Sequence, residues 1–324
     1  MTDIVALGAG RMGRGIAQVF AYAGHDVTIL DFKERTAEDS DKLLAEGKVE
    51  IAENLKFLYS LGIGKEENFP VILGRIKGAS IDDADTVLGN AKFIFEGVPE
   101  LLDLKKDALG RASDLAGADT IIASTTSTML STELAGFTSR PENFLNAHFL
   151  NPAYLIPLVE VSPSEHTDPD QLDKFTNLLK SIGKVPVRCS ASPGYIVPRL
   201  QSAAMNEAVR MVEEGVATPE EIDRAVMTGF GIRYATMGLI EFVDWGGVEI
   251  LHYADAYLSE NLGERFKAPA VIGELIEKGH RGMNHGKGFY DFENIDVGSF
   301  KKQKMATFIA LLEHLKMLPK AADS

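Results

Sequence analysis

The chain has 324 residues, of which 45% are hydrophobic and 25% charged, and its formal net charge is −14. This balance is typical of a globular protein with room for two domains, and it excludes a disordered or fibrous chain. The acidic charge argues against a nucleic acid or an anionic membrane as the partner. No apolar run approaches the roughly 18 residues of a membrane span, so we expect a soluble protein.

The cysteine content and the first residues bear on location. The single cysteine, Cys189, cannot form an internal disulfide, which is typical of a reducing compartment. The first residues lack the basic stretch and apolar run of a secretion signal. We therefore expect a cytoplasmic protein.

The first half of the chain alternates between strand and helix patterns, as a parallel sheet covered by helices requires. An apolar run at residues 3–10 predicts the first strand, and apolar positions from Ile16 to Ala23 predict a helix after it. A β-branched run at 26–31 predicts the second strand, and a longer helix follows over 33–61. Further strands are expected at 91–97, 118–125, 143–149, 158–162 and 185–190, with helices in the gaps, such as 170–182.

The character of the sequence changes at "SASPGYIVP", residues 190–198. The patterns downstream of it are helical. The predicted fold class is α/β, with an N-terminal Rossmann-type, doubly wound parallel sheet over residues 1–190 and an all-helical C-terminal domain over 191–324. The helices expected in the second domain cover 199–215, 218–229, 238–260, 268–279 and 299–317.

The stretch "GAGRMGRG", which begins at Gly8, has the pattern G-x-G-x-x-G between the first strand and its helix. Gly8 would make the tight turn, Gly10 would let the backbone approach a pyrophosphate, and Gly13 would let the helix pack close to the strand. The first helical residues, Arg11 and Met12, would present unpaired N–H groups to the anion. A glycine-rich turn without a ligand would show the same pattern.

The residue that ends the second strand favours the dinucleotide. Asp31 lies 18 residues after Gly13, where a carboxylate would accept hydrogen bonds from the ribose hydroxyls. A carboxylate there would repel a 2′-phosphate, so we predict NAD rather than NADP as the cofactor. Lys33 and Arg35 follow closely and leave NADP open as an alternative.

The second chemical signal lies in "NAHFLNPAYLIPLVEVS", residues 146–162. His148 falls at the C-terminal end of a predicted strand, the edge where doubly wound sheets bind ligands. Glu160, in the next strand pattern, could come alongside it. A carboxylate on one imidazole nitrogen would make the other nitrogen a general base, as alcohol oxidation requires. A histidine packed in the core is the alternative that the spacing leaves open.

The same segment closely resembles the H-F-x-N-P…(L/V)-V-E-V signature of the L-3-hydroxyacyl-CoA dehydrogenase family. The resemblance implies NAD as the cofactor, fatty acid metabolism as the context and a homodimer through the helical domain. Further matches cover nearly the whole chain in the family's order: "FEGVPELLDLKKDAL" (95–109), "ASTTSTM" (123–129), "SPGYIVPRL" (192–200) and "GKGFYDF" (286–292).

Carried over by position, the resemblance implies that His148 is the catalytic base and Glu160 its partner. Ser127 falls on the family's substrate-hydroxyl serine, and Asn151 falls on an asparagine near both the nicotinamide and the base. We therefore assign Ser127 and Asn151 to catalysis and to the cofactor site. Ser127 is one of five hydroxyl residues in a row, so its assignment depends on the resemblance.

Two charged residues fall on cofactor-site positions of the family, namely Glu96 and Lys105. From the residues themselves, Lys105 could equally be a solvated helix lysine and Glu96 a strand-end charge. No metal ion is expected in the site.

Two positions depart from the family members that act on CoA thioesters. Those members read G-F-I-V-N-R at the domain boundary, but this chain has Pro198 in place of the asparagine, and proline has no amide to donate. The stretch "GFGIRYA" resembles relatives that oxidise free hydroxy acids, such as carnitine and gulonate. Its Arg233 could hold a substrate carboxylate or form a structural salt bridge. We expect Ser127, Pro198 and Arg233 to lie at the substrate.

Three functions follow in order of preference. The first is NAD-dependent oxidation of an (S)-3-hydroxyacyl-CoA of the 3-hydroxybutyryl type. The second is oxidation of a free 3-hydroxy acid, with Arg233 on its carboxylate. The third is a non-catalytic NAD-binding protein like the lens crystallins of the family, which the presence of His148, Glu160 and Ser127 argues against. The partner in each catalytic case is a small-molecule substrate.

Overall fold

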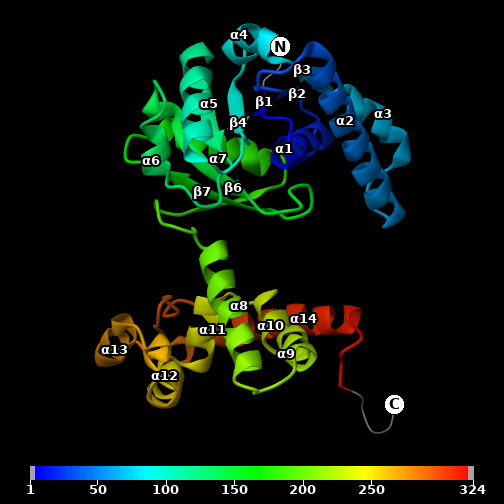
Figure 1. Cartoon of the computed structure of the whole chain (residues 1–324). Helices are drawn as coiled ribbons and strands as arrows, with labels where there is room; N and C mark the ends of the chain where they lie inside the picture. The colour runs from blue at the N-terminus through cyan, green and yellow to red at the C-terminus, as the bar shows by residue number, and fades with distance from the viewer. Residues whose placement is uncertain (1–3, 320–324) are drawn as a thin grey trace. The chain divides into compact units, whose positions relative to one another are not determined.

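The computed structural model describes residues 4–319, and the chain divides into two compact units, Met1–Met205 and Asn206–Ser324 (Figure 1). A single eight-stranded sheet lies in the first unit. Its strands are β1 (Ile4–Leu7), β2 (Val27–Leu30), β3 (Ile76–Ala79), β4 (Phe93–Glu96), β5 (Ile121–Ser124), β6 (Phe144–Phe149), β7 (Leu158–Pro163) and β8 (Val185–Arg188).

The strand order is β3-β2-β1-β4-β5-β6-β7-β8, and all neighbours are parallel except β6 and β7. The order 3-2-1-4-5-6 is that of a doubly wound dinucleotide-binding sheet, so the predicted fold class is confirmed. The predicted parallel pairing holds from β1 to β6, whereas β7 and β8 run antiparallel to those strands. Only residues 150–157 join β6 to β7, and a parallel crossover needs a dozen or more residues.

Helices cover both faces of the sheet because alternate strand residues are apolar on opposite sides. Ile4 and Ala6 of β1 pack into one core with helices α1, α2, α3 and α7, while Val5 and Leu7 pack into a second core with α4, α5 and α6. The helices are α1 (Arg11–Tyr22), α2 (Ala37–Ser60), α3 (Phe69–Gly74), α4 (Ala84–Gly89), α5 (Leu102–Leu115), α6 (Ser131–Ala135) and α7 (Pro169–Ser181), with 3₁₀ turns at Glu66–Asn68, Ile81–Asp83 and Pro141–Asn143.

Local sequence chemistry sets the ends of these helices. The predicted helix over 33–61 begins at Ala37, because the Thr36 side chain caps it by accepting a hydrogen bond from the Asp39 N–H. Strand β3 and the short helices α3 and α4 were not predicted individually. Strand β3 has only four residues with two exposed in its middle, so it shows neither an apolar run nor a full alternation.

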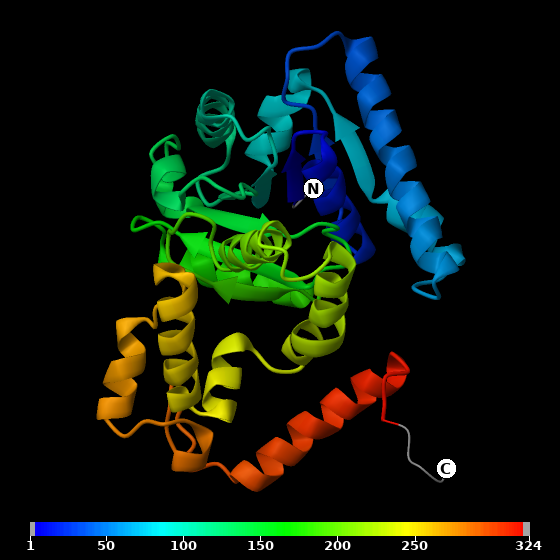
Figure 2. The ribbon, with the colours of Figure 1, turned by 60° about the horizontal axis from the view of Figure 1, so that its bottom comes forward.

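The second unit is helical, apart from isolated bridges at Lys287, among its described residues 206–319 (Figure 2). The predicted helix over 238–260 is broken at Gly247, whose φ of 106° only glycine adopts readily. The elements from the domain boundary onward are α8 (Val197–Glu213), α9 (Pro219–Ala225), a π-helix (Val226–Phe230), α10 (Gly231–Tyr234), α11 (Leu239–Gly246), α12 (Val248–Leu262), α13 (Ala270–Glu277) and α14 (Val297–His314), with 3₁₀ turns at Glu264–Phe266 and Met283–His285.

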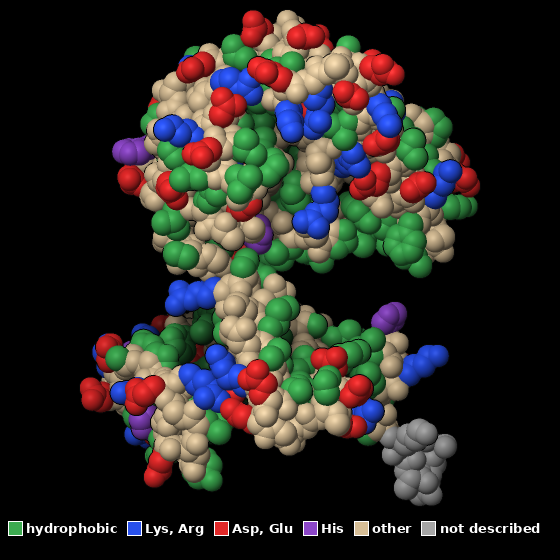
Figure 3. Space-filling view, viewed as in Figure 1, with side chains coloured by type: hydrophobic (Ala, Val, Ile, Leu, Met, Phe, Trp, Pro, Cys, Tyr) green, Lys and Arg blue, Asp and Glu red, His purple; other side chains and the backbone are tan. Residues whose placement is uncertain are grey.

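Charged residues, which make up 25% of the sequence, are visible on the surface (Figure 3). Acidic and basic side chains are interspersed over the face of the first unit drawn in Figure 3. Within residues 4–319, no helix is both long and apolar enough to cross a membrane.

Candidate active site

A cleft of about 1030 Å³ opens at the carboxyl ends of the parallel strands of the first unit. Its wall follows the loops after β1, β2, β4 and β5 and the end of β6, which is where open α/β sheets bind ligands. The cleft brings together eight of the predicted site residues, namely Gly8, Gly10, Arg11, Met12, Asp31, Ser127, His148 and Asn151.

The glycine loop has the geometry that a pyrophosphate requires. Gly8 adopts a φ of 106°, and a Cβ atom on Gly13 would lie 1.8 Å from the Gly8 carbonyl oxygen. Helix α1 can therefore approach β1 only with glycine at residue 13. A Cβ on Gly10 would meet no atom within 4 Å, so the backbone at Gly10 is open to a ligand. The N-terminus of α1 follows at once and offers unpaired N–H groups.

The Asp31 carboxylate fits a ribose. The residue is buried and lines the cleft, and its Oδ2 atom has no hydrogen-bond partner. A buried acceptor without a donor is costly, and the two hydroxyls of a ribose would supply donors. The Arg35 Nε atom lies 3.1 Å from the same oxygen, outside hydrogen-bonding alignment but in ion-pair range.

The antiparallel pairing of β6 and β7 places His148 and Glu160 directly opposite each other. The His148 Nδ1 atom lies 2.7 Å from Glu160 Oε2, and both residues are buried. The other carboxylate oxygen, Oε1, accepts hydrogen bonds of 2.8 Å from the N–H groups of Ile196 and Val197. Because those N–H groups can only donate, the carboxylate is held with Oε2 toward the imidazole.

Tyr195 lies against the imidazole on one side. The ring centroids of His148 and Tyr195 are 5.3 Å apart, and their planes are inclined by 17°. Tyr195 has a φ of 45° and follows Gly194, whose φ is 73°. A left-handed conformation costs a non-glycine residue about 1–2 kcal/mol, so the surrounding contacts must hold this turn in place.

The loop that carries Ser127 is held by a carboxylate that the sequence analysis did not identify. Glu100 Oε1 accepts hydrogen bonds from the N–H groups of Ser127 (3.0 Å) and Thr128 (3.1 Å) and from the hydroxyls of Thr126 and Thr128. Burial raises the pKa of Glu100, but these bonds and Lys105 outweigh it and hold the pKa below its ordinary value. The loop is therefore held most firmly near neutral pH, and the hold weakens as the pH falls through that lowered pKa.

Glu96 and Lys105 form a buried ion pair behind the cleft wall. The Lys105 Nζ atom lies 2.9 Å from Glu96 Oε1 and 3.4 Å from Glu100 Oε2. Neither Glu96 nor Lys105 lines the cleft, so direct contact of either residue with the cofactor stays a prediction. Their observed contacts support Glu100 and, through it, the Ser127 loop.

The two residues at which the sequence departs from the family pattern are placed as follows. Pro198 lies in the first turn of α8, where no N–H donor is needed, and it does not line the cleft. Arg233, in α10 of the second unit, donates from Nε to the Gly229 carbonyl, and its guanidinium lies 4.8 Å from the ring centre of Phe242. No carboxylate among the described residues forms an ion pair with Arg233, so its role at a substrate stays a prediction.

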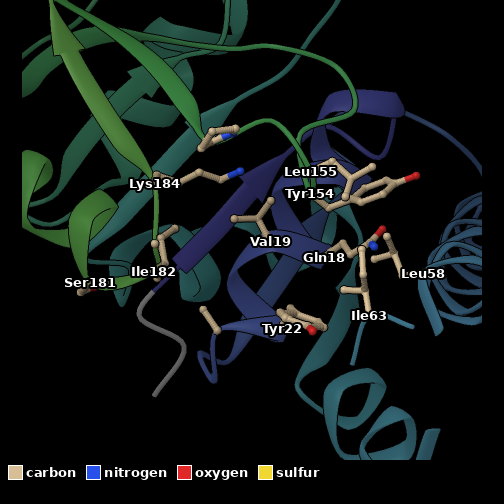
Figure 4. A pocket seen from close by; sticks show the side chains of 13 residues that line it. Gln18, Val19, Tyr22, Leu58, Ile63, Tyr154, Leu155, Ser181, Ile182 and Lys184 are labelled. Carbon is tan, nitrogen blue, oxygen red and sulfur yellow. The ribbon is translucent and has the colours of Figure 1, made fainter. Parts of the chain in front are cut away.

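A second pocket, of about 430 Å³, lies beside α1 and contains none of the predicted site residues (Figure 4). Lys184 extends its side chain at this pocket and donates to the carbonyls of Ala153 (2.5 Å) and Ile156 (2.7 Å). Burial lowers the pKa of Lys184. The lysine thus holds the segment between β6 and β7, which follows His148 in the chain.

Comparison with known proteins gives the family. Two family models match: the NAD binding domain of 3-hydroxyacyl-CoA dehydrogenase over residues 3–192, and the C-terminal domain of 3-hydroxyacyl-CoA dehydrogenase over residues 194–292. A 3-hydroxybutyryl-CoA dehydrogenase of Clostridioides difficile is 33% identical over 290 residues, which are 89% of this chain and 99% of the relative.

Two further proteins match over nearly the full length. A 5-formyl-3-hydroxy-2-methylpyridine 4-carboxylate 5-dehydrogenase of Mesorhizobium japonicum is 29% identical over 95% of this chain and 96% of the relative. The crystal structure of a 3-hydroxyacyl-CoA dehydrogenase of Archaeoglobus fulgidus has a TM-score of 0.77 at 27% identity and covers 98% of this chain and 100% of that one. This chain therefore belongs to the 3-hydroxyacyl-CoA dehydrogenase family, with the NAD-binding domain of that family followed by its C-terminal domain.

Proposed function

We propose that the chain catalyses the NAD-dependent oxidation of an (S)-3-hydroxyacyl-CoA of the 3-hydroxybutyryl type to the 3-oxoacyl-CoA. The observation that carries the proposal is the 2.7 Å contact between His148 Nδ1 and the buried Glu160 carboxylate, because His148 lines the same cleft as the glycine loop. The name of the Clostridioides difficile relative supports the choice of substrate.

The residues suit a base-assisted hydride transfer. With its Nδ1 hydrogen donated to Glu160, the imidazole has a free lone pair on Nε2, which takes the proton of the substrate hydroxyl. Bound NAD would supply the two-electron acceptor for the hydride of the same carbon. The C–O bond becomes a carbonyl, and the Glu160 carboxylate stabilises the imidazolium. Ser127 would bind the substrate oxygen, and Asn151 would orient the reacting groups.

The cofactor would be held mainly by the backbone. Gly8, Gly10, Arg11 and Met12 would surround the pyrophosphate, and Asp31 would accept hydrogen bonds from the ribose hydroxyls. Gly13 serves indirectly, by allowing α1 to start close to β1.

The test is a substrate comparison with the purified protein. NADH absorbance should rise with NAD and (S)-3-hydroxybutyryl-CoA, and it should stay flat with the (R) enantiomer, the matched control. If NADH forms with free 3-hydroxy acids and with no CoA thioester, the proposed substrate class is wrong.

A free 3-hydroxy acid is the second candidate substrate, and one observation favours it. Arg233 is exposed and makes no ion pair within residues 4–319, so its guanidinium is available to a carboxylate. The Mesorhizobium japonicum relative is named for a substrate that bears a free carboxylate. Replacing Arg233 by Gln should then raise KM for the free acid at least tenfold, while Arg224→Gln, at another exposed arginine, should leave KM unchanged.

We also propose that the protein is a homodimer and that it is located in the cytoplasm. Several large apolar side chains of the second unit are exposed, as subunit contacts require. The single cysteine supports a reducing location. Sedimentation of the full chain would test the dimer, and a monomer at micromolar concentration would contradict it. The exposed apolar residues include Val209, Met227, Ile250, Tyr253 and Tyr257.

A further inference from the structure

Tyr195 has contacts that the proposed reaction does not yet use. Its ring is buried against the imidazole of His148. Its hydroxyl accepts a hydrogen bond of 2.9 Å from Asn146 Nδ2 and donates to the Thr126 carbonyl at 3.1 Å, with the Met129 carbonyl at 3.4 Å. The side chain thus joins the base to the loop that carries Ser127.

The acceptor of this hydroxyl belongs to the peptide unit that leads into Ser127. The C=O of Thr126 and the N–H of Ser127 lie in one planar group. The C=O accepts from Tyr195, and the N–H donates to Glu100 Oε1 at 3.0 Å. Both ends of the plane are therefore fixed, and with them the direction in which the Ser127 side chain leaves the backbone.

We propose that Tyr195 is a positioning residue, whose hydroxyl fixes the Thr126–Ser127 peptide and so sets Ser127 at a constant distance and angle from His148. This inference depends on the proposed function, because it assigns Ser127 and His148 to the same reacting hydroxyl. Tyr195 itself takes no proton in the reaction. A phenol is already protonated at neutral pH at its ordinary pKa of about 10, and burial raises the pKa of Tyr195 further.

The backbone around Tyr195 supports the assignment. The N–H groups of the next two residues, Ile196 and Val197, donate to the Glu160 carboxylate. A single short segment thereby contacts the base, the partner of the base and the serine loop. Tyr195 adopts a left-handed conformation in this segment, with a φ of 45°, and such conformations of non-glycine residues cluster at functional sites.

The test is a double-mutant cycle of Tyr195→Phe and Ser127→Ala in the full chain. Tyr195→Phe keeps the ring and removes the hydroxyl, so kcat should fall about tenfold while the Kd for NAD stays unchanged. In the Ser127→Ala background, Tyr195→Phe should lower kcat by less than about twofold, because the Ser127 hydroxyl that Tyr195 positions is already absent. Tyr59→Phe, at a half-exposed ring of α2, is the control and should keep the wild-type kcat.

The outcomes separate this inference from the proposed function. A wild-type kcat for Tyr195→Phe, or an equal loss in both backgrounds, would overturn the positioning role. His148→Gln tests the function independently. If it is inactive while Tyr195→Phe is fully active, the reaction stands and the positioning role fails. If His148→Gln is fully active, the reaction as proposed fails.

Discussion

The glycine loop and His148 line the same cleft, but the loop acts through its backbone, whereas the pair of His148 and Glu160 acts through side chains. The glycine loop is made of backbone: a positive φ at Gly8, a helix N-terminus, and a glycine at residue 13 that no other residue could replace without a clash. The base is made of side chains from separate strands, and each of its hydrogen bonds crosses many residues of sequence.

Because of this difference, a substitution should affect different properties in the two regions. In the glycine loop, an added atom displaces the backbone itself, and the cost falls on cofactor binding and folding together. At the base, an isosteric change leaves the fold in place and alters the position of a single proton. Substitutions of equal size should therefore affect different measurements in the two regions.

The largest effect is expected at the base. His148→Gln removes the only group on the cleft that we assign to accept the hydroxyl proton, and kcat should fall about 10⁴-fold with the Kd for NAD unchanged. His166→Gln, at an exposed histidine of the same unit, is the matched control. Steady-state NADH production and NAD titration give the two values. A loss in NAD affinity equal to the loss in kcat would contradict the separation of the two regions.

Glu160→Gln should come next, and its direction follows from the donors on Oε1. The N–H groups of Ile196 and Val197 need an acceptor, so the amide oxygen would face them and the NH₂ would face His148 Nδ1. The imidazole would then carry its hydrogen on Nε2, which is the wrong tautomer for a base. We expect kcat to fall about 10³-fold.

The matched control for that change is Glu165→Gln at an exposed site. Thermal unfolding should show little difference between the two variants, because every hydrogen bond of Glu160 is replaced. If Glu160→Gln keeps kcat within a factor of ten, the carboxylate does not set the tautomer.

The sequence predicts contacts between residues that are close together in the chain better than contacts between distant residues. The glycine loop and Asp31 lie within about 25 residues of chain, so their spacing carries the geometry, and the expected strand, turn and helix are present. The pairing of His148 with Glu160 was within reach for a similar reason, since eight residues join their strands. That short connection also indicates antiparallel pairing, a direction that the sequence analysis did not assign to this strand.

The contacts that could not be predicted from the sequence are those between loops that lie far apart in the chain. Glu100 and Tyr195 both hold the peptide at Ser127, and they come from the segments after β4 and before α8. No spacing rule relates them. The left-handed conformation of Tyr195 is equally hidden, because aromatic residues rarely adopt it.

A smaller effect is expected in the glycine loop. Gly13→Ala would place a Cβ atom 1.8 Å from the Gly8 carbonyl oxygen, so helix α1 must move away from β1. The free energy of unfolding should fall by about 3 kcal/mol, the upper range for an overpacked core, and NAD affinity should fall with it. Chemical denaturation and NAD titration measure both.

Gly110→Ala, inside α5, is the control for that change. Its Cβ would meet the Phe137 carbonyl at an ordinary 3.6 Å, and alanine is favoured over glycine within a helix by about 1 kcal/mol. Stability should rise or stay constant. If Gly13→Ala behaves in the same way, the close packing of α1 on β1 is not what the loop requires.

The smallest effect concerns the choice between NAD and NADP, at the far end of the cofactor site from the base. Asp31 would repel a 2′-phosphate, while Arg35 is already within 3.1 Å of its carboxylate and Lys33 also lines the cleft. Asp31→Asn removes the negative charge and releases Arg35 for a phosphate. The ratio of kcat/KM for NADP to that for NAD should rise about tenfold, or about 1.4 kcal/mol, close to the roughly 1 kcal/mol between two unit charges 4 Å apart in water.

The double variant Asp31→Asn/Arg35→Gln should lose that gain, because the guanidinium that would meet the phosphate is removed. Neither variant should change the kcat measured with saturating NAD, since the base region is untouched. If Asp31→Asn lowers kcat itself, the adenosine end and the base are coupled, and the contrast between a backbone region and a side-chain region does not hold.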